Sequence, residues 1–225
     1  MPKVSVDIWS DVMCPWCAVG YTQFAKAVEQ LKGELEVDVR FMPFELNPDL
    51  PAEGKDQAKH VAEVYGRSEQ DVAAMRAQMQ QVAERAGFPM AWTGDGPEPR
   101  AMTWNTFAAH RLLRWALAEQ GPGAQARLKV ALLKAHFQQR RNVADRAVLL
   151  DVAAGEGFDR AKAAEALDDE ALAIATRMEE ERGRQAGINS VPSFVVDGRY
   201  LIQGARDPED YANMLRQVAG LIQNA

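Results

Sequence analysis

The chain contains two cysteines, Cys14 and Cys17, which are separated by Pro15 and Trp16. Two thiols at this spacing can close a disulfide across one helical turn or supply half of a zinc site. A structural zinc site needs four ligands, and neither a second cysteine pair nor a finger-like histidine pair is present in the sequence. Two inert core cysteines are the other explanation, but Pro-Trp between them is poor core chemistry. The pair therefore favours thiol-disulfide exchange, and we expect no metal site.

The residues around the pair predict a strand followed by a helix. Apolar and polar residues alternate over residues 4–9, and apolar residues between 19 and 31 fall near helical spacing. Pro15 suits the first helical position, so Cys14 is expected at or beside the N-cap. Free backbone N–H groups and the helix dipole favour a thiolate there. We expect Cys14 to be the attacking sulfur and Cys17 the resolving thiol.

The composition is that of an ordinary globular protein. The 225 residues carry 26% charged and 47% hydrophobic side chains and a net charge of −6, enough for one or two domains with a real core. A negative chain disfavours nucleic acid as a partner. We find neither an apolar run of membrane-spanning length nor the apolar stretch of a signal peptide. We therefore expect a cytoplasmic protein without membrane partners, in which two cysteines cycle rather than form a structural disulfide.

Strand patterns stand at both ends of the chain and helical patterns in the middle. Residues 34–44 alternate like a second strand, which makes a βαβ unit with parallel strands. Pro48 and Pro51 mark a loop that leaves the sheet, and no strand is expected between Pro51 and Asp168. Helices are expected there at Lys55–Tyr65, Ser68–Ala86, Thr103–Glu119, Gly123–Gln139 and Asp145–Gly155, with Ser68 and Asp71 as a capping box and Gly121-Pro122-Gly123 as a break.

The C-terminal part returns to strand patterns. A two-residue hairpin turn is expected at Asp197-Gly198, and Gly187 is a good helix C-cap. The expected elements are a helix at Asp169–Ala186, strands at Ser193–Val196 and Arg199–Ile202, and a last helix at Pro208–Ile222 with the tail Gln223–Ala225. The fold class is therefore α/β with an inserted run of helices.

This order, with two cysteines at the first strand-to-helix junction, resembles the thioredoxin fold with a helical insertion found in the DsbA family of thiol-disulfide oxidoreductases. The resemblance implies a thioredoxin-like domain of residues 1–50 and 169–225 and an all-helical subdomain of residues 51–168 that acts as a lid. It also implies that Pro192 is cis and lies across from Cys14, with the Val191 backbone facing the sulfur. Without the resemblance, Pro192 would only start an edge strand.

Further segments resemble the FrnE-like branch, which is related to 2-hydroxychromene-2-carboxylate isomerases and kappa-class glutathione transferases. These segments are Asp11–Gly20, Pro43–Pro48, Asn105–Leu112, Val191–Phe194 and Gly204-Ala205. The glutathione-using relatives place a serine where Cys14 stands. They also tend to have a polar pair with an Asp after the glycine near the last helix, which Gly204-Ala205-Arg206-Asp207 does not match. Both departures favour dithiol redox chemistry.

We therefore expect a cytoplasmic disulfide reductase or isomerase that works through Cys14, Cys17 and Pro192. No cofactor is implied, with glutathione as an optional co-substrate. The partners would be thiols and disulfides of proteins or small molecules, and the chain would act as a monomer or homodimer. Pro15-Trp16 lacks the histidine of the strongly oxidising DsbA dipeptide, so a less oxidising potential is expected.

The residues expected around the sulfurs form an apolar groove with a few polar contacts. They are Pro15, Trp16, Phe44, Asn47, Trp104, Asn105, His110 and Val191. Trp104 falls near helical spacing with other apolar residues and fits a core position better, whereas His110 fits a packed helix position equally well. Two other functions stay open: a glutathione-dependent isomerase or transferase of aromatic or polyketide-like molecules, and a binding or chaperone-like module. Tolerance of Cys14→Ser would favour the first. Chaperone activity without both cysteines, with no reductase activity in the parent protein, would favour the second.

Overall fold

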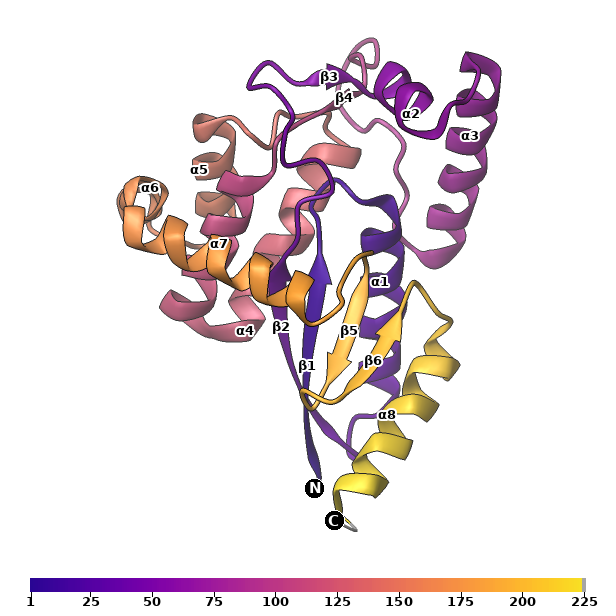
Figure 1. The fold of residues 1–225 in the computed structure, drawn as a ribbon, viewed down its shortest axis with the longest axis vertical. Coiled ribbons are helices and arrows are strands. Elements are labelled where there is room, and N and C mark those ends of the chain that lie inside the picture. Colours follow the sequence, from indigo (N-terminus) through magenta and orange to yellow (C-terminus); the bar gives the residue numbers. More distant parts are fainter. Residues whose placement is uncertain (224–225) are drawn as a thin grey trace.

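The computed structural model describes residues 1–223 and has a four-stranded mixed sheet at its centre (Figure 1). The strand order is β2-β1-β5-β6, in which β1 and β2 are parallel and the other neighbours antiparallel. The bounds are β1 Lys3–Ser10, α1 Pro15–Gln30, β2 Glu36–Pro43, β5 Ser193–Val196 and β6 Tyr200–Gln203. The predicted βαβ unit and the C-terminal hairpin are therefore confirmed. The hairpin loop has three residues, 197–199, and not the two expected, because Val196 pairs with Tyr200 and β6 starts one residue later than predicted. The last two residues of the predicted tail lie outside the described residues.

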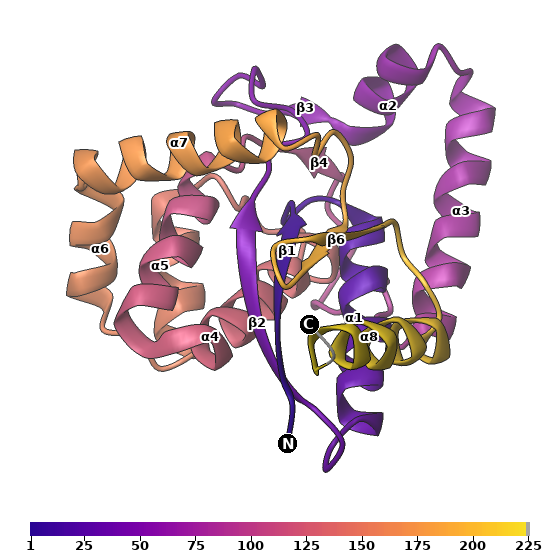
Figure 2. The same ribbon diagram turned by 60° about the horizontal axis from the view of Figure 1, so that its bottom comes forward.

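Helices α1 and α8 (Pro208–Gln223) cover one face of this sheet, away from helices α4 to α7 (Figure 2). Phe24 of α1 is fully buried between Phe194 of β5 and Tyr211 of α8, at ring-centroid distances of 5.1 and 5.3 Å. Each such side chain contributes roughly 1.5–3 kcal/mol by leaving water. This core fixes α1, and with it the segment that contains the two cysteines.

The middle of the chain is mainly helical. Its helices are α2 Gln57–Tyr65, α3 Glu69–Ala86, α4 Phe107–Phe137, α5 Arg146–Gly155, α6 Arg160–Asp168 and α7 Glu170–Gln185. The capping box of Ser68 and Asp71 is present, and α4 is interrupted at Gly121, whose φ of 82° is the left-handed conformation that glycine tolerates. The predicted capping box and helix break are thus confirmed.

Three expectations for this region are wrong. A pair of two-residue strands, β3 Lys55–Asp56 and β4 Met102–Thr103, lies where no strand was expected, so α2 begins at Gln57 and α4 at Phe107. Strands this short have no measurable periodicity. Helix α6 was not predicted, because it buries mainly alanines instead of an apolar stripe. Its start nevertheless has a cap, since the Asp159 carboxylate accepts from the Lys162 N–H at 2.9 Å.

Helix α4 covers the outer edge of the sheet, next to β2 (Figure 2). The buried Gln125 amide pairs with the free backbone of Phe41: it accepts from the N–H at 2.8 Å and donates to the C=O at 2.9 Å. An edge strand otherwise presents unpaired groups. On the same side, α7 comes so close to β1 that a Cβ on Gly183 would lie 2.3 Å from the Trp9 ring. Among residues 1–223 there is no helix with the length and apolar character needed to cross a membrane.

Candidate functional site

The two cysteines lie in the turn between β1 and α1. Cys14 is the N-cap of α1, with φ −82° and ψ 115°, and Pro15 takes the first helical position, as predicted. The Cys14 carbonyl accepts hydrogen bonds from the N–H groups of Cys17 and Ala18 at 3.1 and 3.3 Å. Both cysteines are free thiols, 4% and 2% exposed. The partial positive charge of the helix N-terminus therefore lies at Cys14.

The wall opposite Cys14 is the peptide bond between Val191 and Pro192, which is cis. The Cys14 thiol donates a weak hydrogen bond of 3.7 Å to the Val191 carbonyl oxygen. The Pro192 carbonyl accepts from the Gly204 N–H at 2.8 Å. On the α1 side, a Cβ on Gly20 would lie 2.8 Å from Cγ of Pro192. The predicted cis geometry and the place of the Val191 backbone are confirmed.

A buried lysine from α4 lies close to the two thiols. Lys129 is 1% exposed, its Nζ donates to the Ser10 carbonyl at 3.3 Å, and it lies 5.5 Å from the centre of the Phe41 ring. Burial lowers the pKa of Lys129 to about 8, while the charges of Cys17 and Cys14 act to raise it. Burial and the neighbouring Cys14 raise the pKa of the Cys17 thiol well above its usual value, and Lys129 acts to lower it. An ammonium here stabilises negative charge on either sulfur.

A buried carboxylate completes this charge layer. Asp11 is fully buried, and its oxygens accept from the Leu46 N–H at 2.8 Å and the Met13 N–H at 3.4 Å. The His110 Nε2 lies 3.5 Å from the carboxylate, at the outer limit of a hydrogen bond. Burial favours the neutral acid, but His110, the Leu46 N–H and Lys129 outweigh it, so the pKa of Asp11 lies below its usual value. Asp11 and Lys129 thus form a partly compensated pair of buried charges.

A second buried cluster joins three segments near this layer. Glu45, after β2, and Glu180, on α7, are 4% and 2% exposed, and both carboxylates accept from the Arg177 guanidinium. The Arg177 Cζ lies 3.6 Å from the centre of the Phe107 ring at the start of α4. Burial raises the pKa of Glu45 and of Glu180, and Arg177 acts against this. The cluster therefore depends on Arg177 for its charge balance.

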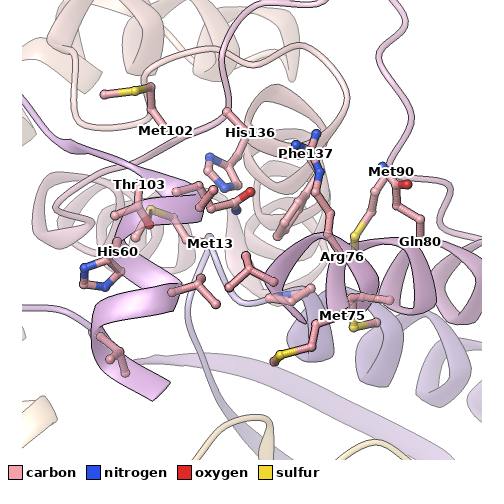
Figure 3. A pocket seen from close by; sticks show the side chains of 18 of the residues that line it. Met13, His60, Met75, Arg76, Gln80, Met90, Met102, Thr103, His136 and Phe137 are labelled. Atoms are coloured by element: carbon pink, nitrogen blue, oxygen red, sulfur yellow. Dashed lines mark hydrogen bonds between the residues drawn. The ribbon is translucent and has the colours of Figure 1, made fainter. Parts of the chain in front are cut away.

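A cavity of about 610 Å³ opens beside the cysteine turn, beneath α2 and α3. Figure 3 shows Met13 and His60 on one side of it and Arg76 and Met90 on the other, with His136 and Phe137 between them. Its lining also includes Pro15 and Trp16, the residues between the cysteines. This volume is typical of a site for a small molecule.

The structure brings some of the predicted contact residues together at the cavity and not others. Pro15, Trp16, Asn47 and Trp104 line it, and the Val191 carbonyl contacts Cys14. The other three lie outside its lining. Phe44 packs against the buried Trp9, Met42 and Ile188. The Asn105 side chain donates a hydrogen bond to the Pro48 carbonyl and accepts one from the Phe107 N–H. His110 is buried beside Asp11. Among residues 1–223, no group of three His, Cys, Asp or Glu side chains could hold a metal ion.

The family model of the DSBA-like thioredoxin domain matches residues 5–216 of the chain. The chain belongs to this family. A probable DsbA oxidoreductase from Streptomyces coelicolor superposes on this DsbA-like protein with a TM-score of 0.83 at 29% identity, covering 96% of the chain and 90% of that structure. The thioredoxin-like fold with a helical insertion and the enzyme class of a thiol-disulfide oxidoreductase follow from this membership.

Two further solved structures share the fold of this DsbA-like protein. One is the cytosolic disulfide reductase DsbM from Pseudomonas aeruginosa with GSH, with a TM-score of 0.62 at 21% identity and coverage of 95% and 98%. The other is a 2-hydroxychromene-2-carboxylate isomerase, with a TM-score of 0.64 at 16% identity and coverage of 98% and 97%. At these identities the likenesses show the shared fold.

Three residues of the DsbA-like site were not singled out from sequence. Lys129 lies on a helical segment with two other basic residues, Arg127 and Lys134, and only its burial distinguishes it. Gly20 is a glycine inside a helix, which indicates close packing, but its neighbour Pro192 is distant in sequence. His136 lines the cavity, and burial lowers its pKa to about 4. Each depends on contacts between distant segments.

Proposed function

We propose that this protein is a cytoplasmic disulfide reductase or isomerase that exchanges disulfides through Cys14 and Cys17. The observation that supports this most is the position of the Cys14 sulfur. It lies at the N-cap of α1, 3.7 Å from the carbonyl that precedes the cis proline, with the buried Lys129 close by. This arrangement favours an anionic sulfur that can attack a disulfide.

In the proposed reaction the Cys14 thiolate attacks one sulfur of a substrate disulfide RS–SR. A Cys14–SR mixed disulfide forms, the RS–SR bond breaks, and one RS⁻ leaves with the electron pair. Cys17 loses its proton and attacks the sulfur of Cys14, which releases the second RS⁻ and closes the Cys14–Cys17 disulfide. The protein dithiol is oxidised by two electrons, and the substrate is reduced to two thiols. Two equivalents of a monothiol such as glutathione then reduce the protein and form the oxidised monothiol dimer.

Lys129 has its role at the second step. Burial keeps the Cys17 thiol protonated, because its pKa lies well above the usual value. Once Cys14 is bonded to substrate, the remaining negative charge must form on Cys17, and the ammonium of Lys129 stabilises it. The carbonyl of Val191 and the ring of Pro192 would meanwhile face the substrate disulfide across from Cys14.

The reductive direction is supported by the residues between the cysteines. Pro15 and Trp16 carry no charge, so they add nothing to the stabilisation of a thiolate and the pair should be less oxidising. The sequence has two cysteines, Cys14 and Cys17, so neither has another partner with which to form a structural disulfide. A reducing compartment suits such a pair.

The test is reduction of insulin disulfides by the purified protein with glutathione as reductant. Cys14→Ser should abolish turnover, whereas Cys17→Ser should accumulate a mixed disulfide that mass spectrometry detects on Cys14. Full activity of Cys14→Ser would contradict the proposal and favour a glutathione-dependent isomerase or transferase. Chaperone activity that survives the loss of both cysteines, with no reductase activity in the parent protein, would favour the binding module.

A further inference from the structure

The cavity beside the cysteine turn has the character of a site for an apolar molecule. Five methionines line it, of nine in the chain: Met13, Met75, Met79, Met90 and Met102. Methionine side chains are flexible and polarizable, so a surface made of them adapts to ligands of different shape. The lining also includes buried side chains, among them Met90 and Phe137, each 5% exposed.

The mouth of the cavity concentrates apolar surface that has no partner within the described residues. Five large apolar side chains there are more than 40% exposed: Trp16, Leu46, Val64, Tyr65 and Met75. Val64 and Tyr65 belong to α2, a helix that has no fully buried residue. A helix with an apolar face normally buries it, and a cluster of exposed apolar residues marks a binding site.

The charged groups of the lining leave little net charge for a ligand. Arg76 and Arg140 both donate to the Glu98 carboxylate, at 2.9 and 2.5 Å. Burial lowers the pKa of His136 to about 4 and lowers that of His60, so both imidazoles are neutral at pH 7. Glu98 lies outside the lining, and Glu69, the acid of the lining, lies at the exposed start of α3. An uncharged ligand body fits this environment better than an anion.

Residues next to Cys14 in the sequence form part of the cavity wall. Met13 and Pro15, the two neighbours of Cys14, are both part of its lining. Met13 is held in place there, since its sulfur accepts from the Trp104 N–H at 2.9 Å. Cys14 itself is not part of the lining, but Trp16, which follows Pro15, is exposed there. A molecule in the cavity would therefore lie beside the turn that holds the sulfur.

We infer that the cavity beneath α2 and α3 binds the uncharged apolar body of a small-molecule disulfide, whose sulfur is presented to Cys14. The inference rests on the proposed function and adds its substrate class. A small molecule is favoured over an extended peptide because the lining combines exposed side chains with the buried Met90 and Phe137, so the cavity has depth, and because its volume of about 610 Å³ is typical of a small-molecule site. The reaction is the exchange written above, with two apolar thiols as products.

The experiment compares two disulfides in single-turnover reactions with the reduced protein. The probes are di-2-naphthyl disulfide, with an apolar body, and bis(2-hydroxyethyl) disulfide, which is too small and polar to use the cavity. Free dithiothreitol gives the intrinsic reactivity ratio of the probes. We expect the protein to favour the naphthyl probe at least tenfold beyond that ratio, and Ala73→Glu in the exposed part of the lining to remove the preference. Ala77→Glu, which adds the same charge to α3 outside the lining, should retain it.

Binding of methyl 2-naphthyl sulfide, which cannot exchange, separates the two proposals. If the small polar disulfide is reduced but the sulfide does not bind and no preference exists, the substrate class is wrong and the proposed function stands. If the sulfide binds the wild type and not Ala73→Glu while neither disulfide is reduced, the cavity binds apolar molecules but the redox function is wrong. A preference for the naphthyl probe that survives Ala73→Glu overturns the assignment to this cavity. A reaction with an aromatic peptide disulfide that is faster than the reaction with the naphthyl probe overturns the small-molecule substrate class.

Discussion

At the scale of single residues, the site is distinguished by charges placed where water is absent. Lys129 keeps one hydrogen bond, to Ser10, and loses the rest of its hydration. Because burial lowers the pKa of Lys129 to about 8, most molecules carry the ammonium at pH 7 and few carry it at pH 9. Its assistance to a thiolate should therefore decline as the pH rises through 8.

The first prediction concerns this ammonium. Lys129→Met keeps the volume and removes the charge, so the thiolate of the reduced pair loses its stabilisation. We expect a reduction potential that is more negative by roughly 30 mV, the equivalent of about 1.4 kcal/mol, and slower release of the second thiol. Equilibration with glutathione buffers measures the potential. Lys134→Met is the matched control, because it makes the same change at an exposed position of α4, and an equal shift in both variants would exclude a specific role.

The second prediction concerns His136, which burial keeps neutral by lowering its pKa to about 4. Its unfolded value is near 6.5, so the unfolded chain binds a proton that the folded chain excludes between these values. The stabilising effect of the neutral ring is therefore present above pH 6.5 and is lost as the pH falls toward 4. The free energy of unfolding should fall by roughly 3 kcal/mol over this pH range. Urea unfolding of wild type and His136→Gln from pH 7 to 4 measures it, and parallel pH curves would disprove it.

Residue-level prediction from sequence succeeded where the signal was local. Pro15 and the strand-to-helix junction identify Cys14 as the N-cap without any distant contact. The place of Pro192 needed the family resemblance, because the 3.7 Å contact to its neighbour Val191 joins residues 177 apart in sequence. Lys129 could not be found this way, since the burial of one lysine among many is a property of the folded chain.

At the scale of elements, the position of the cis proline depends on how closely α1 approaches it. Gly20 allows this approach, and the space that a Cβ would need is taken by the Pro192 ring, 2.8 Å away, and by Ala205, 3.5 Å away. The local sequence predicts a helix here, but it does not predict the close approach to Pro192. The glycine costs the helix up to about 1 kcal/mol relative to alanine, and the close packing gives its physical reason.

The third prediction tests this packing. Gly20→Ala should force Pro192 away from Cys14, which would lower the rate of disulfide reduction about tenfold and the free energy of unfolding by about 1–2 kcal/mol. Gly155→Ala in α5 is the control, because a Cβ there meets no atom within 4 Å. Full activity of Gly20→Ala, with unchanged stability, would show that the Pro192 loop adjusts freely.

Element prediction followed the length of each pattern. The strands of the central sheet and the long helices have enough residues to show a period, and they were found. The paired strands at Lys55–Asp56 and Met102–Thr103 form because two distant loops meet, and nothing in either dipeptide indicates it. The Gln125 amide on the edge of β2 is likewise invisible in sequence, since its partner Phe41 is 84 residues away.

At the scale of the whole molecule, the helical part and the sheet meet at the cysteine turn. Val12 and Met13 pack into the core of α4, α5 and α6, while Ala18 and Val19 pack into the core shared with α3. The two proposed parts of the chain therefore share the segment that does the chemistry. A change in the packing between these two parts should therefore shift the position of Cys14.

The last prediction tests the cluster that joins these parts away from the turn. Arg177 on α7 neutralises Glu45, which follows β2, and Glu180, and it stacks on Phe107 of α4. Arg177→Met leaves two buried carboxylates without their cation. We expect the free energy of unfolding to fall by about 2 kcal/mol at pH 7. This is less than for a fully buried ion pair, because the arginine side chain is 45% exposed and solvent screens its charge.

The sign of the pH dependence makes this prediction specific. Burial already raises the pKa of both carboxyls, and removing the guanidinium raises it further, so the folded variant takes up protons that the unfolded chain does not. Its deficit relative to wild type should therefore shrink as the pH falls from 7 to 5. Arg182→Met, on the same helix in an exposed ion pair with Glu179, should cost under about 0.5 kcal/mol with no such trend. A deficit for Arg177→Met that stays constant with pH would mean that the lost stacking on Phe107, and not the charge, holds the helices to the sheet.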